Sequence, residues 1–256
     1  LNKDLETQAW IYPGETTCGL ERQLPTISVT TLKPEYFTIG SNGALVLLTA
    51  ESHGCNGFSE KNLTLLKENS KTQYITISGR YDSMVLLFSS VENQETQIKT
   101  LVDFVLANDV AGIEIDFEDF GTWSAKDYRD YLGFITRLGT ELQAAQKKLL
   151  VAGPPISSEI EAGYYEWKYA DFAELPVDQL VVMAYDYQAD HGAGSPVAPI
   201  DWTLAIYEQV VAAGIAPEKI VMGIPAYGYV GKTGEFAMEL LTYKQASEHP
   251  LFSRAI

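Results

Sequence analysis

"GIEIDFEDFG", residues 112–121, alternates apolar and acidic side chains over most of its length. Successive side chains of a β-strand point to opposite faces, so a strand here would have one apolar face and one acidic face. The apolar face consists of Ile113, Ile115 and Phe117. The acidic face consists of Glu114, Asp116 and Glu118, with no cation among them. Such a strand needs surroundings that tolerate three neighbouring carboxyl groups.

The rest of the chain repeats one unit, in which an apolar run precedes a segment with helical spacing. Strands are predicted at residues 8–14, 32–40, 73–79, 112–121, 149–155, 179–187 and 219–228, with a hairpin addition at 43–50. Helices are predicted at residues 60–70, 96–108, 124–148 and 203–213. Strands that alternate with helices form βαβ units and a parallel sheet. The pattern therefore predicts an α/β fold, a (β/α)8 TIM-type barrel, which typically has about 250 residues.

The C-terminal tail does not complete this pattern. After the last predicted strand it is short and polar, with no clear eighth strand and helix. We therefore expect a single barrel domain over residues 1–256 that lacks its last strand–helix unit and is truncated at its C-terminus. A doubly wound sheet is the alternative, but the Gly-rich phosphate loop that would favour a nucleotide fold does not follow the first strand.

The composition limits the kinds of partner. The formal net charge is −16, whereas binding phosphates or an anionic membrane surface takes basic residues. We therefore expect no nucleic acid and no membrane as partners, and we expect a monomer. No apolar run approaches the roughly 18 residues of a membrane helix. Cys18 and Cys55 lie in polar loops, and the sequence leaves open whether they form a disulfide or stay as free thiols.

The acidic row fits the mouth of a barrel. Alternate residues of a barrel strand point inward, and active sites lie at the C-terminal ends of the strands. Partly desolvated neighbouring carboxyl groups cannot all ionise cheaply, so Glu118, the outermost, is predicted to keep a proton and act as a general acid beside Asp116. A general acid at a mouth lined with aromatic rings suits glycoside cleavage. An acidic edge strand facing water and a magnesium site remain as alternatives.

Several motifs resemble those of one family. "GIEIDFE" (112–118) is similar to the D-G-x-D-x-D-x-E strand of glycoside hydrolase family 18, the chitinase family. "VVMAYDY" (181–187) resembles its M-x-Y-D motif, "GIPAYGY" (223–229) its G-x-P-x-Y-G motif, and "YITISG" (74–79) its third-strand serine segment. The likeness is greatest to the bacterial subgroup of N-acetylglucosaminidases that cut spore and cell-wall glycans. It implies a chitinase or endo-β-N-acetylglucosaminidase acting on β-1,4-linked N-acetylglucosamine glycans.

The resemblance also implies roles for individual residues. Glu118 matches the proton donor, Asp116 the acid that assists it, and Tyr185 a further catalytic position. The implied substrate-binding residues are Glu114, Asp186, Met183, Tyr12, Ser78 and Tyr227. The family's mechanism is substrate-assisted and retaining, because the sugar's own acetamido group replaces the second carboxylate. We accordingly expect no cofactor, no metal, a partner glycan that contains N-acetylglucosamine, and a secreted or cell-surface location.

Two positions depart from the family's pattern. Ala111 stands where the family has its first Asp, and Glu114 where it has the second. Glu114 keeps the charge but is one methylene longer, so we expect it to alter how the acids share protons. The alternative function is a catalytically weak or silent glycan-binding protein, since some members of the family are lectin-like.

Overall fold

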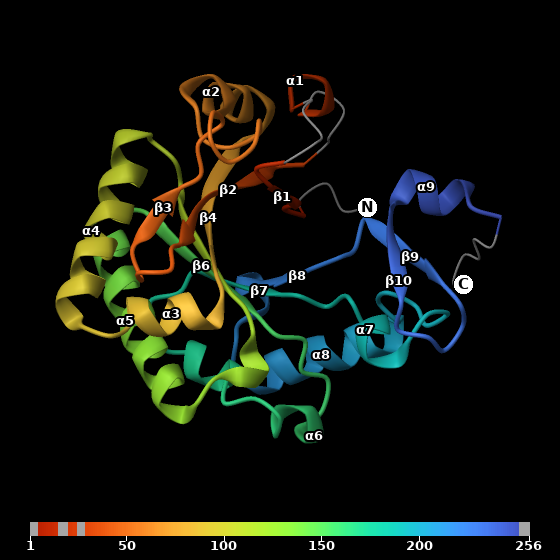
Figure 1. Ribbon diagram of the computed structural model, residues 1–256. Coiled ribbons are helices and arrows are strands. Elements are labelled where there is room, and N and C mark those ends of the chain that lie inside the picture. Colours follow the sequence, from red (N-terminus) through yellow and green to blue (C-terminus); the bar gives the residue numbers. More distant parts are fainter. Residues whose placement is uncertain (1–4, 15–19, 25–28, 251–256) are drawn as a thin grey trace. The chain divides into compact units, whose positions relative to one another are not determined.

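The computed structural model describes residues 5–14, 20–24 and 29–250, and the chain divides into two compact units. The first unit comprises residues 1–152 and 174–180, and the second comprises residues 153–173 and 181–256. Figure 1 shows the helices and strands of both with their labels.

The first unit is built on a parallel sheet. Its strands are β1 (Gln8–Ile11), β2 (Thr31–Ile39), β4 (Thr72–Gly79), β5 (Gly112–Phe117) and β6 (Lys148–Gly153). They follow one another in that order, and each neighbouring pair is parallel. The short strand β3 (Leu45–Leu47) pairs antiparallel with β2, as the predicted hairpin requires. Because β5 has a partner on each side, it is not an edge strand facing water.

The helices of the first unit follow the strands in the predicted alternation. They are α1 (Leu20–Gln23), α2 (Glu60–Asn69), α3 (Tyr81–Leu87), α4 (Val91–Ala107) and α5 (Ala125–Ala144). Ser124 caps α5, and Asp127 completes a capping box, which stabilises the first turn. Helix α4 begins earlier than the predicted residue 96, because Ser90 caps its first turn by accepting from the backbone N–H of Asn93. The short helix α3 was not predicted.

The apolar face of β5 packs against helices. Ile113, Ile115 and Phe117 are at most 1% exposed. The Phe117 ring stacks on Phe134 of α5 with 6.2 Å between centroids, and lies 6.1 Å from the ring of Tyr131. The alternation predicted for this strand is thereby confirmed, and the acidic face points away from the helices.

The second unit contains the end of β7 (Gln179–Val182), which begins in the first unit, and β8 (Ile220–Met222) beside it. Its helices are α6 (Glu159–Ala162), α7 (Gln188–His191), α8 (Ile200–Ala212) and α9 (Tyr243–Glu248). Helix α8 ends just before Gly214, which has a φ of 90°, as its predicted role at the end of the helix requires. Among the helices of the described residues, none is both long and apolar enough to cross a membrane.

The predicted strand 219–228 is wrong in its second half. Strand β8 ends at Met222, and Tyr227 opens a separate strand, β9 (Tyr227–Gly231). Strand β9 pairs antiparallel with β10 (Met238–Thr242) in a two-stranded sheet of its own. The tail therefore does contain a strand and a helix, but β10 adds no strand to the parallel sheet. Cys18 lies outside the described residues, so the question whether it pairs with Cys55 stays open.

Candidate active site

The acidic face of β5 meets polar side chains from the neighbouring strands of the first unit. On β4, Thr76 lies opposite Glu114 and Ser78 lies opposite Asp116. Residues opposite each other on neighbouring strands share a face of the sheet. On β2, Glu35 lies opposite Thr76, so one row crosses three strands.

An irregularity in β2 decides which side chains join this row. The register shifts between Glu35 and Phe37, so that Thr38 rather than Phe37 lies opposite Ser78. Phe37 instead packs edge-on against Phe104 of α4, with 4.9 Å between ring centroids. A bulge of this kind re-aims side chains, and here it keeps the acidic side of the sheet polar up to the ends of the strands.

Glu114 is held at the base of the cluster by a cation. Its Oε2 lies 2.5 Å from Nζ of Lys33, and both side chains are 0% exposed. Its Oε1 accepts hydrogen bonds from Trp10 Nε1 at 2.5 Å and from Thr76 Oγ1 at 3.2 Å. The ammonium group also lies 3.7 Å from the centroid of the Trp10 ring. Burial lowers the pKa of Lys33, and the Glu114 carboxylate opposes that shift.

Asp116, the middle acid of the row, has a raised pKa. Burial, followed by the negative charges of Glu114 and Glu118, raises its pKa to about 8, while Lys33 acts in the opposite direction. Its Oδ1 is buried and accepts no hydrogen bond from the protein. At neutral pH Asp116 is therefore mostly protonated. That Glu118 also keeps a proton stays a prediction.

Glu118 lies one residue beyond β5, and its side chain is exposed. Its backbone is fixed, because its N–H donates to Gly79 O at 3.2 Å and its carbonyl accepts from Trp123 Nε1 at 2.9 Å. Its charge contributes to the raised pKa of Asp116. Glu118 thus has the access to solvent that a group acting on a large substrate requires.

Tyr12 and Ser78, two predicted site residues, border the same acids. Burial, followed by the negative charges of Asp116 and Glu35, raises the pKa of Tyr12 to about 12. The residue as a whole is 62% exposed. Ser78 Oγ donates to Glu35 Oε1 at 2.6 Å. Glu114, predicted to bind substrate, is fully buried and bonded to protein groups, so its burial disfavours direct contact with a substrate.

The other predicted site residues form a cluster within the second unit. The hydroxyl of Tyr227 donates to Asp186 Oδ1 at 2.8 Å, and Gln188 Nε2 donates to the same oxygen at 3.4 Å. Asp186 has a φ of 65°, a conformation that costs most residues energy and that Asp tolerates better than others. The Tyr185 ring lies edge-on to Tyr227, 6.3 Å between centroids. Met183 is half-buried beside them in the chain.

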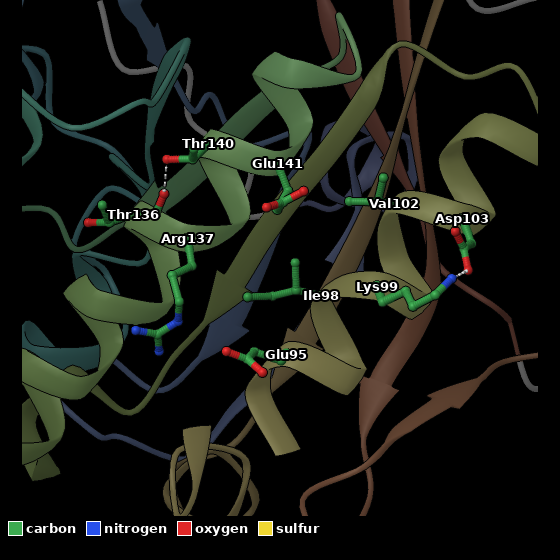
Figure 2. A pocket seen from close by; sticks show the side chains of 9 residues that line it. All are labelled: Glu95, Ile98, Lys99, Val102, Asp103, Thr136, Arg137, Thr140 and Glu141. Carbon is green, nitrogen blue, oxygen red and sulfur yellow. Dashed lines mark hydrogen bonds and ion pairs between the residues drawn. The ribbon is translucent and has the colours of Figure 1, made fainter. Parts of the chain in front are cut away.

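A groove elsewhere in the first unit contains none of these residues. Figure 2 shows this groove, of about 460 Å³, between α4 and α5, with Ile98 and Val102 among charged side chains of both signs. Lys99 and Asp103 pair with each other along α4. Over the ranges 5–14, 20–24 and 29–250, no group of three or more His, Cys, Asp or Glu side chains could hold a metal ion. The magnesium alternative therefore gains no support from the described residues.

Comparison with known proteins identifies the family. The model of "Glycosyl hydrolases family 18" matches residues 10–249. The chain belongs to glycosyl hydrolase family 18. The family 18 chain is 31% identical over 135 residues to the mouse (Mus musculus) di-N-acetylchitobiase, an alignment that covers 50% of this chain and 36% of that protein. It spans about half the length, or less, of the curated relatives it matches.

Solved structures confirm the fold of this family 18 chain. The chitinase of Chromobacterium violaceum ATCC 12472 superposes with a TM-score of 0.75 at 23% identity, covering 95% of this chain and 75% of that one. The spore cortex-lytic enzyme SleL of Bacillus megaterium QM B1551 gives a TM-score of 0.74 at 21% identity, covering 95% and 56%. The predicted (β/α)8-type fold is thereby confirmed, and the predicted family is confirmed by the family model. The expectation of one catalytic domain over residues 1–256 stays a prediction.

Sequence reasoning missed Lys33, Glu35 and Thr76 as members of the cluster. Lys33 and Glu35 stand two residues apart in the segment 32–40, so they share a face of β2. This spacing indicates a polar face on the strand, and it is the signal in the sequence from which both residues could have been predicted. Lys33 is 81 residues from Glu114, and only the pairing of β2, β4 and β5 brings the two together.

Proposed function

We propose that this family 18 chain hydrolyses β-1,4-linked N-acetylglucosamine glycans, with Glu118 as the general acid and base and Asp116 as its assisting acid. The observation that carries the proposal is the acidic row of β5, where an exposed Glu118 follows an Asp116 whose pKa is raised to about 8. A carboxyl group that exchanges its proton near neutral pH suits acid–base chemistry in that range.

The chemistry follows from the charges of the row. Glu118 donates a proton to the bridging oxygen while the acetamido oxygen of the sugar attacks the anomeric carbon, and the bond to the leaving sugar breaks. The resulting oxazolinium ion carries a positive charge, and water opens it with net retention of configuration. Asp116 stabilises that charge as a carboxylate, because its proton passes to Glu118, which delivers a proton to the bridging oxygen and later takes one from the attacking water. A pKa near neutrality makes this transfer inexpensive.

The cluster of the second unit supports the same assignment through the family resemblance. Tyr185 and Asp186 match the pair that holds the acetamido group, and Tyr227 matches a sugar contact. The hydrogen bond from Tyr227 fixes one carboxylate oxygen of Asp186. We include Met183 as a further contact to the sugar. The proposed partner is a chitin-like or cell-wall glycan, met outside the cytoplasm.

The substitution Glu118→Gln tests the proposal. Glutamine keeps the size of the side chain but cannot donate an acidic proton, so we expect a loss of turnover of at least about 100-fold. The substrates are N-acetylglucosamine oligomers of defined length and muropeptides, with products identified by mass spectrometry. Glu141→Gln, an exposed position on α5, is the matched control and should retain wild-type activity.

Each outcome assigns a function. Product release that is lost in Glu118→Gln and retained in the control supports hydrolysis, and the product masses distinguish chitin from cell-wall glycan and endo from exo cleavage. Unchanged turnover in Glu118→Gln removes this residue from the mechanism. Binding of the oligomers without any product from the wild-type protein favours the glycan-binding alternative.

A further inference from the structure

Lys33 places a buried positive charge beneath the acids of β5. Its ammonium group lies between Glu114 Oε2 and the ring of Trp10, with no exposure to solvent. Removing two charges from water costs several kcal/mol for each ion, and apolar residues of the same volume often stabilise a protein core more. Packing alone is therefore a weak reason for an ion pair at this position.

The position of the Lys33–Glu114 pair lets the charge of Lys33 also act on Asp116. Asp116 follows Glu114 on the same face of β5, and the charged side chains that act on it are Glu114, Glu118, Glu35 and Lys33. Tyr12, beyond the end of β1, faces the same acids with its hydroxyl. Lys33 is the cation of this set. Its charge opposes burial and the three carboxylates, which together favour the protonated form of Asp116.

We propose that Lys33 is a positioning residue of the hydrolytic site, which neutralises Glu114 and thereby sets how readily Asp116 releases its proton during the reaction. The proposal rests on the proposed function of the acidic row. Without the ammonium group, Glu114 and Asp116 would be two buried acids sharing protons. Without Glu114, the ammonium group would take Asp116 as its nearest counter-ion. The two single losses therefore shift the proton affinity of Asp116 in opposite directions.

The test uses Lys33→Met, Glu114→Gln and the double variant that carries both. Methionine and glutamine keep the approximate side-chain volume and remove one charge each, and circular dichroism checks the fold. The titration of the Asp116 carboxyl carbon is followed by carbon-13 nuclear magnetic resonance in the full chain. The pH profile of kcat/KM on an N-acetylglucosamine oligomer is measured in parallel.

We expect a defined order of the apparent pKa of Asp116. It should fall by at least about one unit in Glu114→Gln and rise in Lys33→Met, and the double variant should lie between the single variants. The limb of the pH profile governed by this carboxyl should move with it. If Lys33→Met does not fold, Glu114→Gln and the double variant still give the comparison, because restoring the charge of Lys33 should then lower the apparent pKa.

Two results would overturn the proposal. One is an apparent pKa of Asp116 that agrees within measurement error among all folded variants, which leaves Lys33 a packing role only. The other is the predicted pKa order with an unmoved pH profile, which separates Lys33 from the reaction. The titration needs no turnover. If the variants show the predicted pKa order but the wild-type protein releases no product, the hydrolytic proposal is overturned and the electrostatic coupling is not.

Discussion

The ammonium group of Lys33 lies 2.5 Å from Glu114 Oε2, and neither side chain is exposed to solvent. This contact explains how β5 carries three acids on a face that is not an edge. The deepest acid is neutralised by a cation from another strand, the middle acid holds a proton, and the outermost acid reaches solvent. The three carboxyl groups of one short segment thus occupy three different electrostatic environments.

Breaking the buried pair should destabilise the protein strongly. Lys33→Ala leaves the Glu114 carboxylate buried without its cation, and we expect the free energy of unfolding to fall by about 3–5 kcal/mol. Urea unfolding followed by tryptophan fluorescence measures it. Lys126→Ala is the control, since it removes the exposed pair with Asp130, and exposed pairs contribute little. Equal urea midpoints for the two variants would show that the buried Lys33 pair contributes no more to the free energy of unfolding than the exposed pair.

Gly79 allows the end of β4 to approach β5 closely. A Cβ atom at this position would lie 2.7 Å from Phe117 Cδ1 and 2.8 Å from Ile39 Cδ1, so Gly79→Ala should overpack the core and cost about 1–3 kcal/mol. Its carbonyl also anchors the backbone of Glu118, so kcat should fall with stability.

Gly133→Ala is the matched control for this substitution. At Gly133, inside α5, the nearest atom to a Cβ would be Arg137 Nη1 at 3.6 Å, which is an ordinary contact. Alanine in a helix interior is favoured over glycine by about 0.5–1 kcal/mol, so this variant should be as stable as the wild type or more so. Thermal unfolding compares the two variants, and a more stable Gly79→Ala would contradict the packing described.

The raised pKa of Asp116 also makes the stability of the folded protein depend on pH. The acid binds its proton more tightly in the folded state than at the unfolded value near 3.8, so its contribution is full at low pH and is lost as pH rises towards about 8. Asp116→Asn removes this dependence. The Tm of the variant should therefore gain on that of the wild type between about pH 5 and about pH 9, by more than about 4 °C. Parallel Tm curves would show that the pKa of Asp116 is not raised.

Asp186 depends on its charge for the proposed contact with the acetamido group. Asn tolerates the same positive φ and can accept the hydrogen bond of Tyr227, so Asp186→Asn should keep its Tm. Hydrogen bonds to charged groups contribute about 1.5–3 kcal/mol, and we expect kcat/KM on an N-acetylglucosamine oligomer to fall by about 10–100-fold. Asp190→Asn, exposed on α7, is the control. A wild-type kcat/KM for Asp186→Asn would remove this carboxylate from the site.

Local patterns predicted those parts of the fold that depend on neighbouring residues. The alternation from Ile113 to Glu118 gave the two faces of β5, and Ser124 gave the start of α5. Strand β8 was drawn too long because the apolar run continues past Met222, whereas β9 has its own partner in β10. Pairing between distant segments is not visible in a local pattern.

The residues of the candidate site likewise divide into those that a local pattern predicts and those that depend on pairing between distant segments. Its acids stand in one segment and were found, and the aromatic and carboxyl residues of the second unit were carried over from the family's motifs. Lys33 was missed because its partner lies on another strand, 81 residues away. The raised pKa of Asp116 is not visible in the sequence, because the sequence shows spacing but not burial. Burial and the neighbouring charges are what raise the pKa of Asp116.

The anomeric configuration of the first product tests the central claim most directly. Wild-type protein is mixed with an N-acetylglucosamine oligomer, and proton nuclear magnetic resonance follows the new reducing end before it equilibrates. If Glu118 donates the proton and the sugar's acetamido group attacks, the β-anomer appears first. Initial release of the α-anomer, or equal cleavage of a matching oligomer without acetamido groups, would contradict the account.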